Sequence, residues 1–209
     1  MSDKTITWTD TVAQLQHSSH PVRSLATRLL HGSILCAVLY QLIGSSFLSR
    51  PIPGEALDLP TQIHEYVGLG SMALVLAFWG WTLVRRGETS LGRLVPWFQR
   101  ARRQAVLADL QAQARQLMRL QVPSDDDGAL ASAIHGLGLL TLSAMAISGT
   151  IYFALDSGTF ARTALSLHKL MANLMWAYLI GHASLAVLHH AMGSDILSRM
   201  FWRGSRPAR

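Results

Sequence analysis

The chain has 209 residues, of which 50% are hydrophobic and 14% are charged. This balance is too apolar for an ordinary soluble domain and indicates membrane-spanning segments. The single cysteine, Cys36, excludes an internal disulfide and a multi-cysteine zinc or iron–sulfur site. The formal net charge is +6, but Lys and Arg flank the apolar runs instead of forming one patch. Nucleic acid is therefore not an expected partner.

The first half of the chain predicts a polar tail and two membrane spans. Residues 1–22 lack the basic start and apolar run of a signal peptide, so we expect an N-terminal tail that is not cleaved. The apolar run over residues 25–48 is long enough to cross a bilayer, and so is the run over 61–84. A Pro-rich loop joins them.

Residues 87–128 form the longest predicted connection. The stretch 94–120 predicts an amphipathic helix, and its arginines supply positive charge. The apolar residues that fall broadly on one side of this helix are Trp97, Phe98, Val106, Leu110 and Leu117. The pattern suits a helix that lies on the membrane surface or docks a partner, and a simple interfacial connector is the plainer alternative.

Two further spans are predicted over 129–155 and 164–190, followed by a basic tail that ends with residues 206–209. The expected fold is all-α: an integral membrane four-helix bundle with an additional amphipathic surface helix between the second and third spans. Fifteen Lys and Arg lie on the side of the termini and the long loop, against three on the other side. The positive-inside rule then predicts that both termini and the 87–128 loop are cytoplasmic.

Four histidines lie within the predicted spans. His168 and His182 stand 14 residues apart, which is roughly 21 Å along a helix and returns the chain to within about 40° of its starting direction. The topology converts sequence position into depth, so His31 shares the inner level with His182, and His64 shares the outer level with His168. Two such pairs in a four-helix bundle are what two bis-imidazole haems require.

Other interpretations of these histidines remain open. A lone histidine in a membrane often joins two helices by a hydrogen bond or belongs to a proton path. A di-metal centre would normally draw carboxylates from the same helices, and only Glu65 is near. A haem-free scaffold or transporter component is the competing class of protein. The small residues around the sites favour a flat porphyrin; they are Gly32, Gly68, Gly70, Gly181 and Ala183.

The fourth span, with the sequence HKLMANLMWAYLIGH…LHH, resembles the corresponding helix of the bacterial cytochrome b561 family. That helix has two histidines separated by thirteen residues, and a His-His pair follows seven residues on. The resemblance covers about residues 23–205 and includes the RLLH segment ending at His31, His64 in the second span, and His135 with Gly149 in the third. Two departures are Gly32, where compact members have an aromatic residue, and the longer 87–128 connection.

The resemblance implies two haem b groups, with axial ligands His31 and His182 at the inner level and His64 and His168 at the outer level. It further implies a bacterial inner-membrane protein that moves electrons from a periplasmic donor to the quinone pool, with ubiquinone as acceptor. One hypothesis is a superoxide:ubiquinone oxidoreductase. The alternative is an electron-relay subunit that serves a periplasmic dehydrogenase or hydrogenase, because a long basic surface helix could dock another subunit.

Several further residues are candidates for roles near these sites. His189 and His190 at the inner boundary could contact a quinone, lipid headgroups or a haem propionate. His135 resembles a family position that is not a ligand, which leaves it a structural or quinone-site role. Arg162 and Lys169 flank His168, where they either attract an anion such as superoxide or form an ordinary charged helix start.

Overall fold

The computed structural model describes residues 23–49, 56–85, 90–119, 128–155, 157–192 and 196–201, and within these ranges it contains helices and no strand. The helices long and apolar enough to cross a membrane are α2 (Leu25–Gly44, continued by the 3-10 turn η1, Ser45–Phe47), α3 (Leu59–Val84), α6 (Ala129–Leu155) and α7 (Gly158–Ala191). The predicted all-α membrane bundle is confirmed. The expected tails, 1–22 and 206–209, lie outside the described residues.

The first two spans begin at side-chain caps that the sequence supplies. Ser24 Oγ accepts a hydrogen bond from the Thr27 amide at 3.2 Å, at the start of α2. Asp58 Oδ1 does the same for the Thr61 amide at 3.2 Å, and Pro60 stands in the first turn of α3. Such caps satisfy amides that have no partner within the helix. They fix where each span starts.

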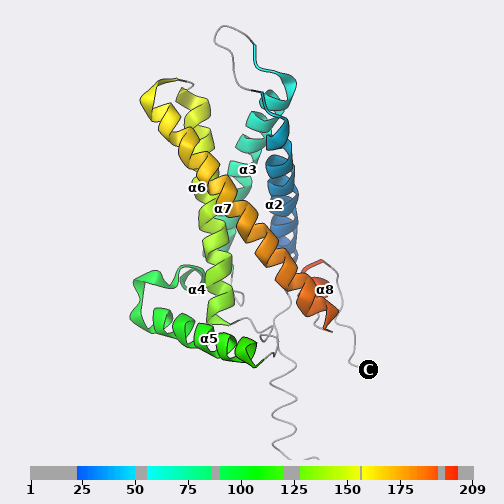
Figure 1. Ribbon diagram of the computed structural model, residues 1–209, viewed down its shortest axis with the longest axis vertical. Helices are drawn as coiled ribbons and strands as arrows, with labels where there is room; N and C mark the ends of the chain where they lie inside the picture. Colours follow the sequence, from blue (N-terminus) through cyan, green and yellow to red (C-terminus); the bar gives the residue numbers. More distant parts are fainter. Residues whose placement is uncertain are drawn as a thin grey trace, which may run out of the picture.

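The fourth span begins earlier than the sequence predicts, at Gly158 instead of residue 164. Gly158 has φ +95°, a backbone conformation that favours glycine, and it allows a tight turn after Leu155. With 34 residues, α7 is roughly 50 Å long, which exceeds the roughly 30 Å of a bilayer's hydrocarbon core. Figure 1 shows α7 running obliquely across the bundle toward α8 (Ile196–Phe201). Tilt accommodates part of the excess length.

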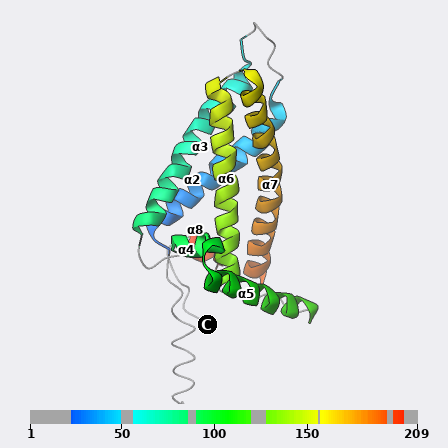
Figure 2. The ribbon, with the colours of Figure 1, turned by 90° about the vertical axis from the view of Figure 1, so that its left-hand side faces the viewer.

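Adjacent spans run in opposite directions, and polar side chains join them (Figures 1 and 2). Trp79 Nε1 on α3 donates to Ser143 Oγ on α6 at 3.0 Å. Trp81 Nε1 donates to Thr27 Oγ1 on α2 at 2.8 Å. Interhelical hydrogen bonds of this kind help to join helices where no water competes. We call the end where α2 and α6 begin and α7 ends the basic end, and the other the opposite end.

A small apolar core occupies the middle of the bundle. Its buried members are Val38, Leu42, Val75, Leu142, Met145 and Met175. Met175 stands halfway between His168 and His182 in sequence, and it is only 3% exposed. The core therefore separates the two levels at which the histidines lie.

The long connection is not the single helix that the sequence predicts over 94–120. It contains α4 (Leu91–Leu94), the 3-10 turn η2 (Pro96–Phe98) and α5 (Arg100–Met118). The break has a local cause, because a residue before proline avoids the helical region, and Val95 has φ −121° and ψ 73°. Trp97 and Phe98 therefore do not belong to the face of α5.

The surface helix α5 caps the third span. Asp109 Oδ2 accepts a hydrogen bond from the Leu130 amide, in the first turn of α6, at 2.9 Å. Gly128 leaves room for this carboxylate, and Gly136 leaves room for the Leu94 carbonyl against α6. Figures 1 and 2 show α5 running across the direction of the spans at the basic end.

Candidate functional site

At the opposite end, the structure brings together His64 of α3 and His168 of α7. Their ring centroids lie 6.2 Å apart, and the ring planes are 87° apart. Two metal–nitrogen bonds of about 2 Å each, plus about 1 Å from each nitrogen to its ring centre, give roughly 6 Å between imidazoles that share one metal. The pair deduced from depth thus leaves room for one metal ion between the two imidazoles.

A second contact assigns the position of the hydrogen on the His168 ring. Nδ1 lies 2.8 Å from the carbonyl oxygen of Met145 on α6. Because a carbonyl only accepts, Nδ1 carries the hydrogen and Nε2 keeps its lone pair for a metal. The ring rests on the α6 backbone at Gly149, where a Cβ would stand 2.9 Å from Nδ1. This carbonyl–imidazole arrangement is typical of metal-ligating histidines.

Gln41 supports the other histidine of this pair, and sequence reasoning missed it. Its Nε2 donates to the His64 carbonyl oxygen at 2.8 Å, and the side chain is 8% exposed. Gly68 admits the amide, because a Cβ there would be 3.0 Å from Nε2. The sequence did contain a signal for Gln41, because a glutamine inside an apolar span costs free energy and tends to be kept for a function. The buried His64 Nδ1 has no hydrogen-bond partner among the described residues.

At the basic end, three histidines from three spans converge. The His182 ring on α7 lies 5.1 Å from the His135 ring on α6, with the planes 81° apart. His31 on α2 is near enough to interact electrostatically with both. Tyr178, one turn before His182, stacks on its ring at 5.3 Å and 9°. The depth argument places His31 and His182 together, but His135 also belongs to this level and lies beside His182.

The short helix α8 closes the basic-end site. Its Phe201 ring lies 6.2 Å from the His31 ring, and Arg28 Nε donates to the Met200 carbonyl at 3.1 Å. A Cβ at the half-buried Gly32 or at the exposed Gly181 would meet no heavy atom within 4 Å. These glycines follow His31 and precede His182 in sequence.

The remaining candidate residues fall into different environments. His189 is buried, with 7% exposure, whereas the adjacent His190 is exposed. The two therefore cannot share one role. Arg162 and Lys169 are exposed at the opposite end, and Arg162 Nη2 donates to Thr159 Oγ1 at 3.3 Å.

Across the described ranges, no three His, Cys, Asp or Glu side chains are arranged to hold a bare metal ion. Imidazoles from different spans, meeting at two levels of a membrane bundle, instead define the class of membrane-spanning b-type cytochromes.

The comparison with protein families agrees with this class. A family model for prokaryotic cytochrome b561 matches residues 22–203, and the chain belongs to this family. The protein is thus a multi-pass bacterial membrane cytochrome that binds haem b and carries electrons across the membrane. No curated protein and no solved structure matched the chain.

Proposed function

We propose that the protein binds two haem b groups, one held by His64 and His168 and the other by His31 and His182. The observation that carries this proposal is the His64–His168 geometry, with ring centroids 6.2 Å apart and the His168 Nδ1 hydrogen directed to a backbone carbonyl. For the second pair, the support is that His31 and His182 lie at the same end of the bundle and interact electrostatically.

The side chains around each pair serve electron transfer and not oxygen activation. Haem b would supply one-electron iron chemistry, and two histidines from the chain at each haem would leave no coordination position open for oxygen. The Met145 carbonyl orients His168 and raises the basicity of its Nε2. The apolar core around Met175 keeps water from the path between the two levels.

The distribution of charge supports an orientation of the bundle, and the proposed donor and acceptor then give the direction of transfer. We place the basic end in the cytoplasm and the opposite end in the periplasm of the bacterial inner membrane. Electrons enter near His168 from superoxide or a periplasmic donor protein, and the exposed cations Arg162 and Lys169 raise the local concentration of an anionic donor. They leave near His182 to ubiquinone, where His135 and the exposed His190 are the candidates for quinone contact and proton exchange.

Haem analysis of single-ligand variants tests the ligand assignment. A pyridine haemochrome measurement is expected to give two haem b per chain. His168→Ala and His64→Ala should each remove one haem with the same low-temperature spectrum, and His31→Ala and His182→Ala should each remove the other. His190→Ala is the matched control and should retain both. Loss of the same haem from His168→Ala and His31→Ala would contradict the pairing.

Assays with the purified chain test the direction and the partners. Superoxide should reduce the haems, and ubiquinone should reoxidise them, without any other protein. Arg162→Gln combined with Lys169→Gln should slow the superoxide step and remove much of its dependence on ionic strength. Quinone reduction that requires a second protein would instead identify an electron-relay subunit.

A further inference from the structure

The helix α5 docks on the bundle through a mostly polar stripe. Its half-buried residues recur every three or four positions, and they are Arg102, Val106, Asp109, Gln113 and Gln116. The contact that anchors this stripe is the Asp109–Leu130 hydrogen bond described above. Val106 is the apolar member of this stripe, and the larger apolar residues of α5 lie outside it.

Those apolar residues form a second, exposed side of the helix. With about 100° per residue they fall within a sector of about 100°. They are Leu107 at 55% exposure, Leu110 at 48%, Leu117 at 58% and Met118 at 77%. Phe98, just before the helix, is 88% exposed. Exposure of this much contiguous apolar surface to water is unfavourable, so something covers it.

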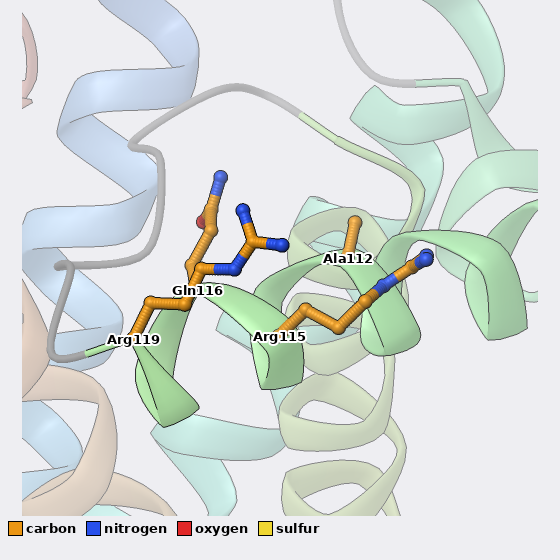
Figure 3. A pocket seen from close by; sticks show the side chains of 4 residues that line it. All are labelled: Ala112, Arg115, Gln116 and Arg119. Carbon is orange, nitrogen blue, oxygen red and sulfur yellow. The ribbon is translucent and has the colours of Figure 1, made fainter.

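The third side of α5 is polar and faces away from the leucines. A shallow recess there is lined by Ala112, Arg115, Gln116 and Arg119 (Figure 3). Its centre lies roughly 160° around the helix from the apolar sector, with the docking stripe between the two. The leucines and this arginine pair thus occupy nearly opposite sides of a helix that is attached sideways to the bundle.

Charge and position indicate what covers the leucines. Between residues 100 and 119 there are five arginines and one acidic residue, Asp109. Arg100 and Arg103 are exposed and lie in or at the edge of the apolar sector, where long side chains can reach phosphates while their stems stay in apolar surroundings. The helix runs across the direction of the spans at one end of the bundle (Figures 1 and 2), where the apolar spans begin or end.

We propose that α5 lies in the membrane interface at the basic end, with Leu107, Leu110, Leu117 and Met118 among the acyl chains of acidic phospholipids. Arg100 and Arg103 bind the headgroup phosphates, and Arg115 and Arg119 face water. Amphipathic helices bind anionic bilayers through this combination of buried apolar area and positive charge. The inference depends on the membrane bundle and is independent of the electron donor and acceptor.

Site-directed fluorescence distinguishes lipid from water at single positions. In a Cys36→Ser background, Leu110→Cys and the control Ala108→Cys are each labelled with an environment-sensitive fluorophore, and the full-length holoprotein is placed in nanodiscs. Ala108 is exposed on the same helix, about 160° from Leu110. Brominated acyl chains should quench the label at 110 at least about threefold more strongly than the label at 108, and aqueous iodide should show the reverse order. Leu117→Cys repeats the test at a second position.

A second experiment varies the charge of the lipid headgroups. Quenching at position 110 by brominated chains should increase in nanodiscs that contain phosphatidylglycerol, relative to phosphatidylcholine alone. Arg100→Gln with Arg103→Gln should remove most of that increase, whereas Arg115→Gln with Arg119→Gln, which loses the same charge from the water-facing side, should leave most of it.

Two outcomes would overturn the proposal. One is equal access of iodide to positions 108 and 110 in nanodiscs. The other is shielding of position 110 only when a second protein is present, which would assign the apolar side to a protein partner. Haem absorbance of each variant reports folding separately, so this test and that of the haem ligands can fail independently.

Discussion

At the scale of single residues, several glycines act by leaving room for another side chain. Gly149 lets the His168 ring rest on the backbone of α6, and Gly138 makes the corresponding space for Tyr178, which stacks on His182. Neither glycine is needed for an unusual backbone conformation, because both lie inside a regular helix. Their effect on the histidines is therefore steric and can be tested by adding a single methyl group.

Gly149→Ala is expected to displace the His168 ring, because the new Cβ would stand 2.9 Å from Nδ1. Overpacking of this kind costs about 1–3 kcal/mol, and here the cost falls on the ligand and on its bond to the Met145 carbonyl. The haem at the opposite end should lose occupancy or change its electron paramagnetic resonance signal, while the other haem is unchanged. Gly80→Ala is the control, since a Cβ there meets nothing within 4 Å. Identical spectra for both variants would contradict the steric argument.

At the scale of secondary-structure elements, α5 and α6 form one unit through Asp109. The Asp109 carboxylate accepts a hydrogen bond from an amide in the first turn of α6, although it belongs to another helix. Such an amide normally bonds to the N-cap side chain of its own helix. Because α6 carries the Met145 carbonyl and His135, the capping contact anchors the start of a helix that contributes to both sites.

Asp109→Ala should loosen the first turn of α6, since it leaves the Leu130 amide without its acceptor. The expected local destabilisation is about 1 kcal/mol, the usual value for loss of a helix cap. Hydrogen exchange at residues 129–132 should become several-fold faster. Asp109→Asn should change exchange less, because its amide oxygen still accepts, and Gln104→Ala on exposed α5 surface should not change it. Unchanged exchange in Asp109→Ala would show that the contact does not stabilise α6.

A hydrogen bond from Arg28 helps to hold the short helix α8, and Arg28→Gln tests this contact. The substitution removes the Arg28–Met200 hydrogen bond, so Phe201 should leave the His31 ring more often. The haem at the basic end should then become more accessible to an aqueous reductant such as dithionite, with an increase of a few-fold in its reduction rate. Arg162→Gln, the same charge change at the opposite end, should leave that rate unchanged. Equal rates in Arg28→Gln and the unmodified protein would rule out α8 as a cover.

At the scale of the whole molecule, hydropathy was sufficient to predict the four spans, and helical geometry with topology was sufficient to bring His64 and His168 together. Hydropathy identifies the residues that lie in lipid, but it does not show where the helix that contains them begins. The polar first turns of α7, which begin at Gly158, were therefore not predicted. The amphipathic pattern extended across Pro96, although proline and its predecessor interrupt the helix. Depth alone could not predict which of His31, His135 and His182 lie next to each other, because all three occupy one level.

The proposed orientation of the whole bundle can be tested by cysteine accessibility. In the Cys36→Ser background, Ser157→Cys lies at the opposite end and Gln111→Cys lies on α5 at the basic end, and both positions are exposed. A membrane-impermeant maleimide added to intact spheroplasts should label position 157 within minutes. Position 111 should react only after the membrane is broken. The inverse pattern would place the basic end outside and reverse the proposed direction of electron flow.

Because the apolar core around Met175 separates the two histidine levels, the membrane voltage acts on an electron that passes between them. With the proposed ligands, the two levels lie about 21 Å apart along the tilted α7, so an electron crosses at most about two-thirds of a roughly 30 Å hydrocarbon layer and of its voltage. Inward transfer against an inside-negative potential of about 100 mV then costs at most about 1.6 kcal/mol. An energised membrane should lower the equilibrium ratio of reduced to oxidised basic-end haem by up to about fifteenfold, and an uncoupler should restore that ratio. Respiratory voltage would thereby regulate the flow of electrons through this chain without any regulatory ligand.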